Sequence, residues 1–140
     1  MLRTITNEEL ALMDLLEKST GAKATDAFTS DDFVFFVVQK GDLGKAIGRH
    51  GVNIEKMKKA FDKNIGVIEQ ATDLKGFVAS LFAPVLVTAV NENTDGERKT
   101  VTVFVEQKDR GQAIGKGGEK IKKARVFLNR YYNITDVKLG

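Results

Sequence analysis

Two glycine-rich stretches of nearly the same sequence stand out as candidates for binding phosphate. GKAIGRHG occupies residues 44–51, and GQAIGKGG occupies residues 111–118 at a constant offset of 67. Of the 13 glycines in the chain, 8 lie in or just before these stretches. Each stretch is expected to run into a helix, where unpaired backbone N–H groups and the helix dipole favour an anion. The repeat therefore indicates two sites for a phosphate or a phosphate-containing polymer.

The spacing of the glycines does not fit the common nucleotide-binding motifs. A P-loop has four residues between its first glycine and its Gly-Lys pair, whereas Gly111 and Gly115 are separated by three, and Gly117 replaces the hydroxyl that would hold magnesium. The dinucleotide motif G-x-G-x-x-G is missing from both stretches. The remaining interpretation is a Gly-x-x-Gly turn against a nucleic-acid backbone, at residues 48–51 and 115–118.

The charge distribution also indicates a polyanionic partner. Residues 40–63 contain seven Lys or Arg and three Asp or Glu, and residues 107–130 contain eight and two. The two windows together carry a net charge of +10. Because the whole chain has a net charge of +3, the remaining residues carry −7. Each basic window contains one glycine-rich turn, as expected of a nucleic-acid-binding surface. The alternative is a pair of solvated, lysine-rich helix faces.

The elements that must position these turns occur in the same order twice. Hydrophobic periodicity, capping residues and turn residues predict helix, strand, strand, glycine-rich turn, helix and strand in each half. In the first half the predicted elements are a helix at 7–21, strands at 24–28 and 33–40, a helix at 52–64 and a strand at 65–70. In the second half they are a helix at 72–83, strands at 85–90 and 99–107 joined by 91–98, a helix at 119–133 and a strand at 134–139. The repeat predicts two domains, at residues 1–70 and 71–140.

Both turns lie within a longer repeated motif. An isoleucine precedes the first glycine and another follows three residues after the last, as Ile47 and Ile54 and as Ile114 and Ile121. The pattern Ile-Gly-x-x-Gly-x-x-Ile, preceded by a strand and followed by a basic helix, resembles the KH domain, which binds single-stranded RNA and DNA. The element order resembles the type II form. Two closely joined copies over the whole chain are similar to the archaeal NusA family of transcription termination and antitermination factors.

This resemblance implies a fold and a set of RNA-binding residues. The implied fold is α+β, with two consecutive type II KH domains of order α-β-β-α-α-β, each a three-stranded mixed sheet with helices packed on one face. The implied function is single-stranded RNA binding in transcription termination or antitermination, through two Gly-x-x-Gly backbone clamps. The implied RNA-binding residues are Lys45, Ile47, Gly48, Arg49, His50, Gly51, Ile114, Gly115, Lys116, Gly117, Gly118, Lys120 and Lys123.

These residues are expected to act in different ways. Arg49 can engage a phosphate through two hydrogen bonds, whereas Lys116 acts as a point charge. His50 is expected to hydrogen-bond to a phosphate or sugar, with a solvated loop residue as the alternative. Ile47 and Ile114 are expected to line the groove for the bases, and ordinary core packing is an equally weighted alternative.

The composition indicates a binding protein rather than an enzyme. The chain has no cysteine and one histidine, so we expect no metal site and no cofactor. No nucleophile, base and orienting group converge by spacing. We expect a cytoplasmic monomer without membrane contact, whose partners are single-stranded RNA and, further, RNA polymerase or other transcription factors. The alternatives are a ribosome-associated or RNA-processing KH protein and a protein-interaction scaffold whose glycines merely form tight connections.

Overall fold

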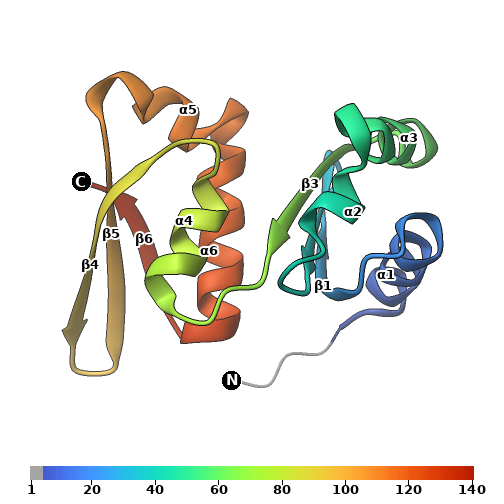
Figure 1. Cartoon of the computed structure of the whole chain (residues 1–140). Coiled ribbons are helices and arrows are strands. Elements are labelled where there is room, and N and C mark those ends of the chain that lie inside the picture. The colour runs from blue at the N-terminus through green and yellow to red at the C-terminus, as the bar shows by residue number, and fades with distance from the viewer. Residues whose placement is uncertain (1–4) are drawn as a thin grey trace. The chain divides into compact units, whose positions relative to one another are not determined.

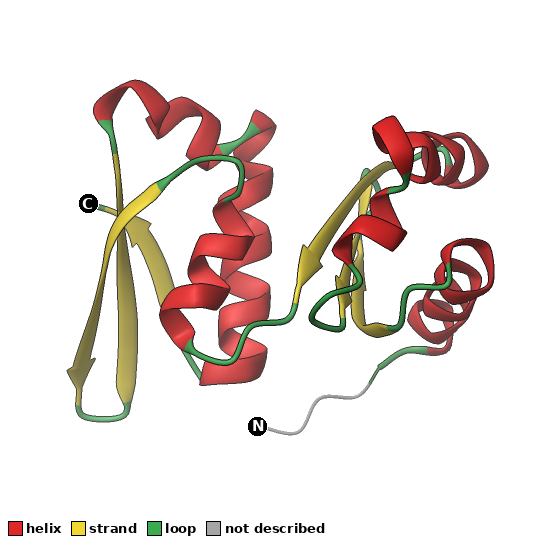
Figure 2. Cartoon of the chain, viewed as in Figure 1, coloured by secondary structure: helices red, strands yellow, loops and turns green. Residues whose placement is uncertain are grey.

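The computed structural model describes residues 5–140, which form two compact units. The N-terminal unit ends at residue 70 and the C-terminal unit comprises Ala71–Gly140 (Figure 1). Within the described residues each unit contains three α-helices and one three-stranded sheet (Figure 2). The order α-β-β-α-α-β is present in both, so the predicted α+β fold with mixed three-stranded sheets is confirmed.

The N-terminal unit is organised around its central strand. The sheet order is β1-β2-β3, with β2 antiparallel to β1 and parallel to β3. All six residues of β2 are buried, so this strand is covered on both faces. The elements are α1 (Asn7–Thr20), β1 (Ala24–Thr29), β2 (Phe33–Val38), α2 (Leu43–Ile47), α3 (Val52–Phe61) and β3 (Asn64–Glu69).

Helix α1 begins and ends where its local sequence dictates. Thr6 is the N-cap. Its hydroxyl accepts the backbone N–H of Glu9 at 3.1 Å, and its own N–H donates to the Glu9 carboxylate at 3.2 Å, which completes a capping box. Gly21 ends the helix with φ 78°, a left-handed conformation that glycine adopts without a Cβ penalty.

One face of the first sheet carries the helices and the core between them. The alternate β2 residues Val34, Phe36 and Val38 point to this face and are at most 1% exposed. Leu16 from α1 and Ala46 from α2 are both 0% exposed in the same cluster. The helices that flank the glycine-rich turn are therefore held by the core rather than by the turn itself.

The C-terminal unit repeats this topology with a longer hairpin. The sheet order is β4-β5-β6, again antiparallel then parallel. Residues 91–95 were predicted as part of a loop but belong to β4, and the chain turns at residues 96–97. Gly96 has φ 63°, so a two-residue connection suffices, and the polar residues before it can stay in the ladder. The elements are α4 (Leu74–Phe82), β4 (Val87–Asp95), β5 (Arg98–Val105), α5 (Arg110–Ile114), α6 (Glu119–Tyr132) and β6 (Asp136–Leu139).

Among residues 5–140, no helix combines the length and the apolar character needed to cross a bilayer.

Gly66 offers a test of the packing in the first sheet. It pairs with Phe35 across β2 and β3, and a Cβ at position 66 would overlap the Phe35 ring, which is 4% exposed and has little room to move. Gly66→Ala should lower the free energy of unfolding by about 1–3 kcal/mol, measured by urea denaturation. Gly44→Ala is the control, because that helical position has open space and alanine should raise stability by about 0.5–1 kcal/mol. Equal effects of the two substitutions would contradict this account.

Candidate nucleic-acid interface

The two glycine-rich turns share one hydrogen-bonding frame. In the N-terminal unit the N–H of Gly48 donates to the carbonyl of Gly44 at 2.9 Å, and that of Gly51 donates to the carbonyl of Gly48 at 3.1 Å. In the C-terminal unit Gly115 donates to Gly111 and Gly118 donates to Gly115, both at 3.1 Å. Each turn therefore closes one short helix and opens a longer one by the same bonds.

The first glycine of each turn has a backbone conformation that other residues rarely adopt. Gly48 has φ 78° and ψ 167°, and Gly115 has φ 82° and ψ 167°. This region is essentially restricted to glycine. A Cβ on Gly48 would lie 2.7 Å from Nδ2 of Asn53, and one on Gly115 would lie 2.9 Å from the backbone nitrogen of Lys120. Glycine is thus required at these positions by both conformation and space.

The last two residues of each turn are left-handed, and the turn is open on its outer side. His50 and Gly51 have φ 56° and 74°, and Gly117 and Gly118 have φ 64° and 76°. A Cβ built on Gly51 or Gly117 meets no atom within 4 Å. The outer side of the turn is therefore free for another molecule to approach the backbone.

The residues between the glycines present cations to solvent. Arg49, His50 and Lys116 are all exposed. Within residues 5–140, neither Arg49 nor Lys116 forms an ion pair, since the ion pairs there involve other cations. Both side chains are therefore available to a phosphate, as the sequence predicts for these positions.

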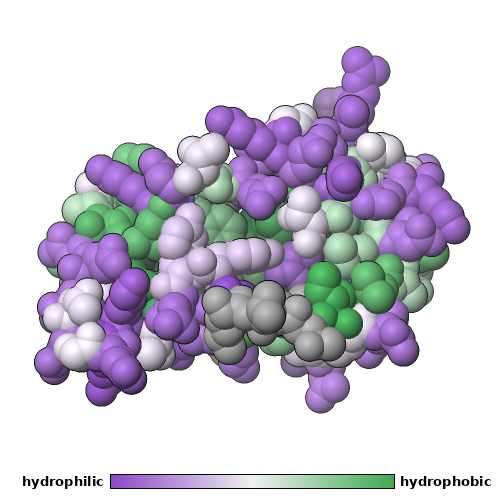
Figure 3. Space-filling view, turned by 90° about the horizontal axis from the view of Figure 1, so that it is seen from below, coloured by the Kyte–Doolittle hydropathy of each residue, from purple (hydrophilic) through white to green (hydrophobic). Residues whose placement is uncertain are grey.

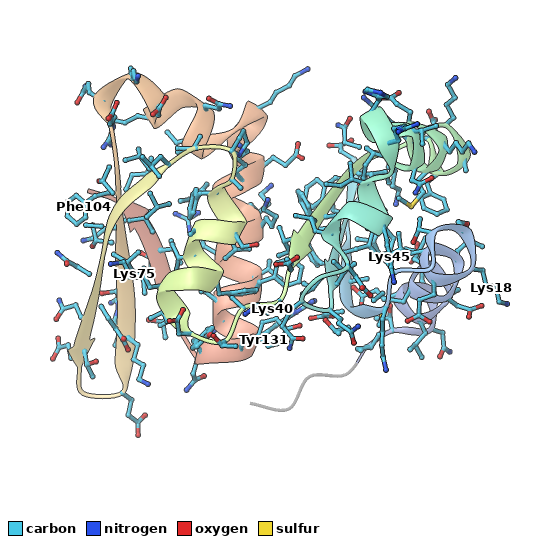
Figure 4. The ribbon with its side chains drawn as sticks, in the orientation of Figure 1. Lys18, Lys40, Lys45, Lys75, Phe104 and Tyr131 are labelled. Carbon is cyan, nitrogen blue, oxygen red and sulfur yellow. The ribbon has the colours of Figure 1, made fainter. Side chains whose placement is uncertain are left out.

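The neighbouring lysines differ in how available they are. Lys45 projects from α2 (Figure 4) and is exposed, but its Nζ lies 3.8 Å from a carboxylate oxygen of Asp42. Lys120 is partly buried, and burial lowers its pKa while the charge of Glu119 acts in the opposite direction. Lys45 is the freer of these two to contribute long-range attraction.

Lys123 lies in a different environment from the other predicted contacts. It is 5% exposed, although the sequence analysis places it among the implied RNA-binding residues. Burial, reinforced by the charge of Lys120, lowers its pKa from 10.5 to about 8 against the opposing effect of Glu119. The repeat does not reveal the burial of Lys123, because the equivalent residue of α3 is also a lysine. That residue, Lys56, is exposed. Lys123 therefore differs from the exposed Arg49 and Lys116 in how much of its side chain reaches solvent.

The two isoleucines before the turns lie at the surface rather than in the core. Ile47 is half-buried and Ile114 is 40% exposed, and neither belongs to the buried core. Val52, the first residue of α3, is also 44% exposed, so the first turn has apolar side chains on both sides. The sequence analysis did not single out Val52, although an apolar residue directly after the last glycine was the signal that could have found it.

Asn53 is a second residue that sequence reasoning missed. Its side-chain Nδ2 donates to the backbone carbonyl of Lys45 at 2.9 Å, which joins the end of α2 to the start of α3 across the turn. The equivalent residue after the second turn is Lys120. No local signal predicted this bond, because it depends on how α2 and α3 meet.

Tyr131 and Tyr132 pack against another helix. The ring of Tyr131 meets that of Phe77 edge-on, with 5.5 Å between the ring centroids. The centroid of the Tyr132 ring lies 6.0 Å from that of Phe77. These contacts join the C-terminal end of α6 to α4, so the aromatic rings do not form a stacking surface beside the turn.

Proteins similar to this chain are known both by sequence and by structure. The chain is 35% identical over 139 residues to the "Probable transcription termination protein NusA" of Halococcus morrhuae, covering 98% of each chain. It is 33% identical to the protein of the same name from Methanococcus vannielii, over 96% of this chain and 78% of the other. Among solved structures, the crystal structure of APE1850 matches with a TM-score of 0.85 and 34% identity, over 97% of this chain and 100% of that one. No protein-family model matches the chain.

The environment of Lys123 predicts a measurable pH dependence. Because its pKa is about 8 in the folded protein and near 10.5 in the unfolded chain, the unfolded state binds more protons between these values. This group should therefore make the folded state more stable as pH rises from 8 to 10.5. Carbon-13 NMR of the lysine Cε atoms should show one titration near pH 8, missing in Lys123→Met, and the rise in stability should be smaller in that variant. A Lys123 midpoint near 10.5 would contradict the burial.

Proposed function

Because the chain belongs to the archaeal NusA family of transcription termination proteins, we propose that it binds single-stranded RNA through its two Gly-x-x-Gly turns and acts in transcription termination or antitermination. Each turn is the RNA clamp of one KH domain, with the boundary between the domains at residues 70 and 71. The name of the relatives supports a role in transcription, and the clamp is argued from the turns themselves. RNA polymerase or other transcription factors are the further partners that such a role requires.

The observation that carries the proposal is the same strained turn made twice with an outward cation. Gly48 and Gly115 agree within 4° in φ and have the same ψ. A merely tight connection would not need an unpaired, exposed cation as its second residue, yet Arg49 and Lys116 occupy that position. A phosphate beside the turn would meet a bare backbone and one cation in each unit.

We expect the bases to lie beside the first turn, along the elements around it. Helices α2 and α3 both contact β3, which is an edge strand of its sheet (Figure 1). Ile47, at the end of α2, provides an apolar surface next to the turn. With the phosphates at residues 48–51, the adjoining bases would lie along this helix and strand. Phosphate contacts then fix the position of the strand, while base contacts give any sequence preference.

The two clamps are chemically different. Arg49 offers a planar guanidinium that can bind a phosphate through two hydrogen bonds, and His50 adds an aromatic polar ring. Lys116 offers a single point charge, and Gly117 leaves the backbone bare. The first clamp should therefore give the more geometrically specific contact, and the second should allow the closer approach.

Reversing both turn charges tests the proposal directly. Arg49→Asp combined with Lys116→Asp should weaken binding to a single-stranded RNA pool by about 100-fold or more, because two charge-assisted contacts are lost. The dependence of log affinity on log salt should flatten by about 1.4, measured by fluorescence anisotropy. The fold should be retained, since both side chains are exposed.

A charge-matched control uses lysines away from the turns. Lys75→Asp combined with Lys138→Asp changes the net charge equally at exposed positions, one near the start of α4 (Figure 4) and one in β6. This control should lose far less affinity than the turn variant. If the turn variant binds RNA as tightly as the original chain, the clamp proposal is wrong.

His50 tests whether the two clamps differ as proposed. His50→Gly should change the free energy of unfolding by less than about 1 kcal/mol, because relief of the left-handed conformation offsets the entropy of glycine in the unfolded chain. RNA affinity should fall by about threefold to tenfold, as expected for one lost hydrogen bond. The reciprocal variant Gly117→His has open space and nearly the same φ, so it should bind at least as well as the original. Unchanged affinity in His50→Gly would remove the histidine from the site.

A further inference from the structure

An open groove lies between α1 and α3 of the N-terminal unit and extends from Asn53, just after the first turn, to Phe61. Its volume is about 300 Å³. The apolar part is formed by Leu15 of α1 with Met57, Ala60 and Phe61 of α3. The polar lining residues are Ser19, Thr20, Asn53 and Lys56. The groove is therefore an amphipathic seam between two helices that the N-terminal unit does not fill itself.

The repeat shows what fills the equivalent seam in the other unit. At the offset of 67, Ala60 corresponds to Phe127. Phe127 is 0% exposed, and its ring is stacked on that of Tyr131, which also packs against Phe77 of α4. The C-terminal unit thus uses aromatic rings to join its first and last helices. The N-terminal unit has only a methyl group at the same position, so the space remains open.

The apolar rim of the groove is open to solvent on α1. Leu15, which lines the groove, is 46% exposed. Figure 3 shows the underside of Figure 1, where a small group of hydrophobic residues lies among hydrophilic ones near α1, on the side away from α3. An exposed apolar rim beside an open groove is a feature of protein interaction surfaces.

Charge narrows the chemistry of the occupant. Lys56 is the only charged residue that lines the groove, it is exposed, and it forms no ion pair within residues 5–140. It would pair with a carboxylate. On α1 the exposed carboxylate of Glu8 would repel a nucleic-acid backbone, whereas the charge of Asp14 is balanced by its ion pair with Lys18 at 2.9 Å. These charges favour a protein segment over RNA.

We propose that the α1–α3 groove is a docking site for a protein partner, which inserts an aromatic side chain where the C-terminal unit has Phe127 and pairs an acidic residue with Lys56. The partner segment is a short amphipathic one, because the groove admits one or two side chains and the exposed Leu15 extends its apolar contact. The groove adjoins the first turn at Asn53, which lines it and donates to the carbonyl of Lys45, while Arg49 is not among the lining residues.

The test uses the full chain and a displayed library of random 12-residue peptides. Selection is made against the original chain and counter-selection against Ala60→Phe, which places in the groove the ring that the C-terminal unit already has. Peptides with an aromatic residue and a nearby Asp or Glu should be enriched. A synthetic peptide of this class should bind Ala60→Phe at least tenfold more weakly than the original chain, and it should shift the methyl NMR signal of Met57.

A pair of lysine variants keeps the proposal testable if Ala60→Phe does not fold. Lys56→Glu changes only an exposed side chain and should weaken peptide binding at least fivefold. Lys58→Glu, at an exposed position of the same helix outside the groove, should bind as the original does. The proposal is overturned if no such class is enriched or if both lysine variants bind equally. It is also overturned if a 12-nucleotide single-stranded RNA displaces the peptide and shifts Met57, which would assign the groove to RNA.

Discussion

The left-handed backbone at residues 48–51 and 115–118 is the constraint on which the arrangement of each unit depends. Three of the four residues in each turn have positive φ, so the chain changes direction sharply between two helices. The first glycine of each turn has no room for a Cβ, whereas the outer side of the turn is open. The same geometry that requires glycine inside therefore exposes the backbone and the adjacent cation outside.

The turn is held by the helices on either side of it, and those helices are held by the core. Ala46 in α2 and Ala113 in α5 are both 0% exposed, and their small side chains allow these short helices to lie close to the core. Met57 of α3 and Ala124 of α6 are buried on the far side of each turn. Because both ends of the turn are anchored in packed cores, its conformation is established before any ligand arrives, which limits the entropy lost on binding.

The two units preserve the turn but differ in the residues around it. Asn53 joins α2 to α3 in the N-terminal unit, while the C-terminal unit has Lys120 at that position. Lys56 is exposed, whereas its counterpart Lys123 is buried. Both units keep the same order of elements despite these differences. The differences give each copy its own surface, so one unit can acquire an interaction that the other does not have.

The sequence by itself determined the repeat, the order of the elements and the positions of both turns. These are local properties: glycine tolerates positive φ, capping residues set helix ends, and apolar spacing distinguishes helix from strand. Only the tertiary structure decided that β4 extends to Asp95, that Lys123 is buried, and that Asn53 joins α2 to α3. The groove beside Ala60 likewise depends on α1, far away in the sequence. Burial, partner choice and empty space are set by residues that meet only after folding, and the spacing of residues along one segment does not contain them.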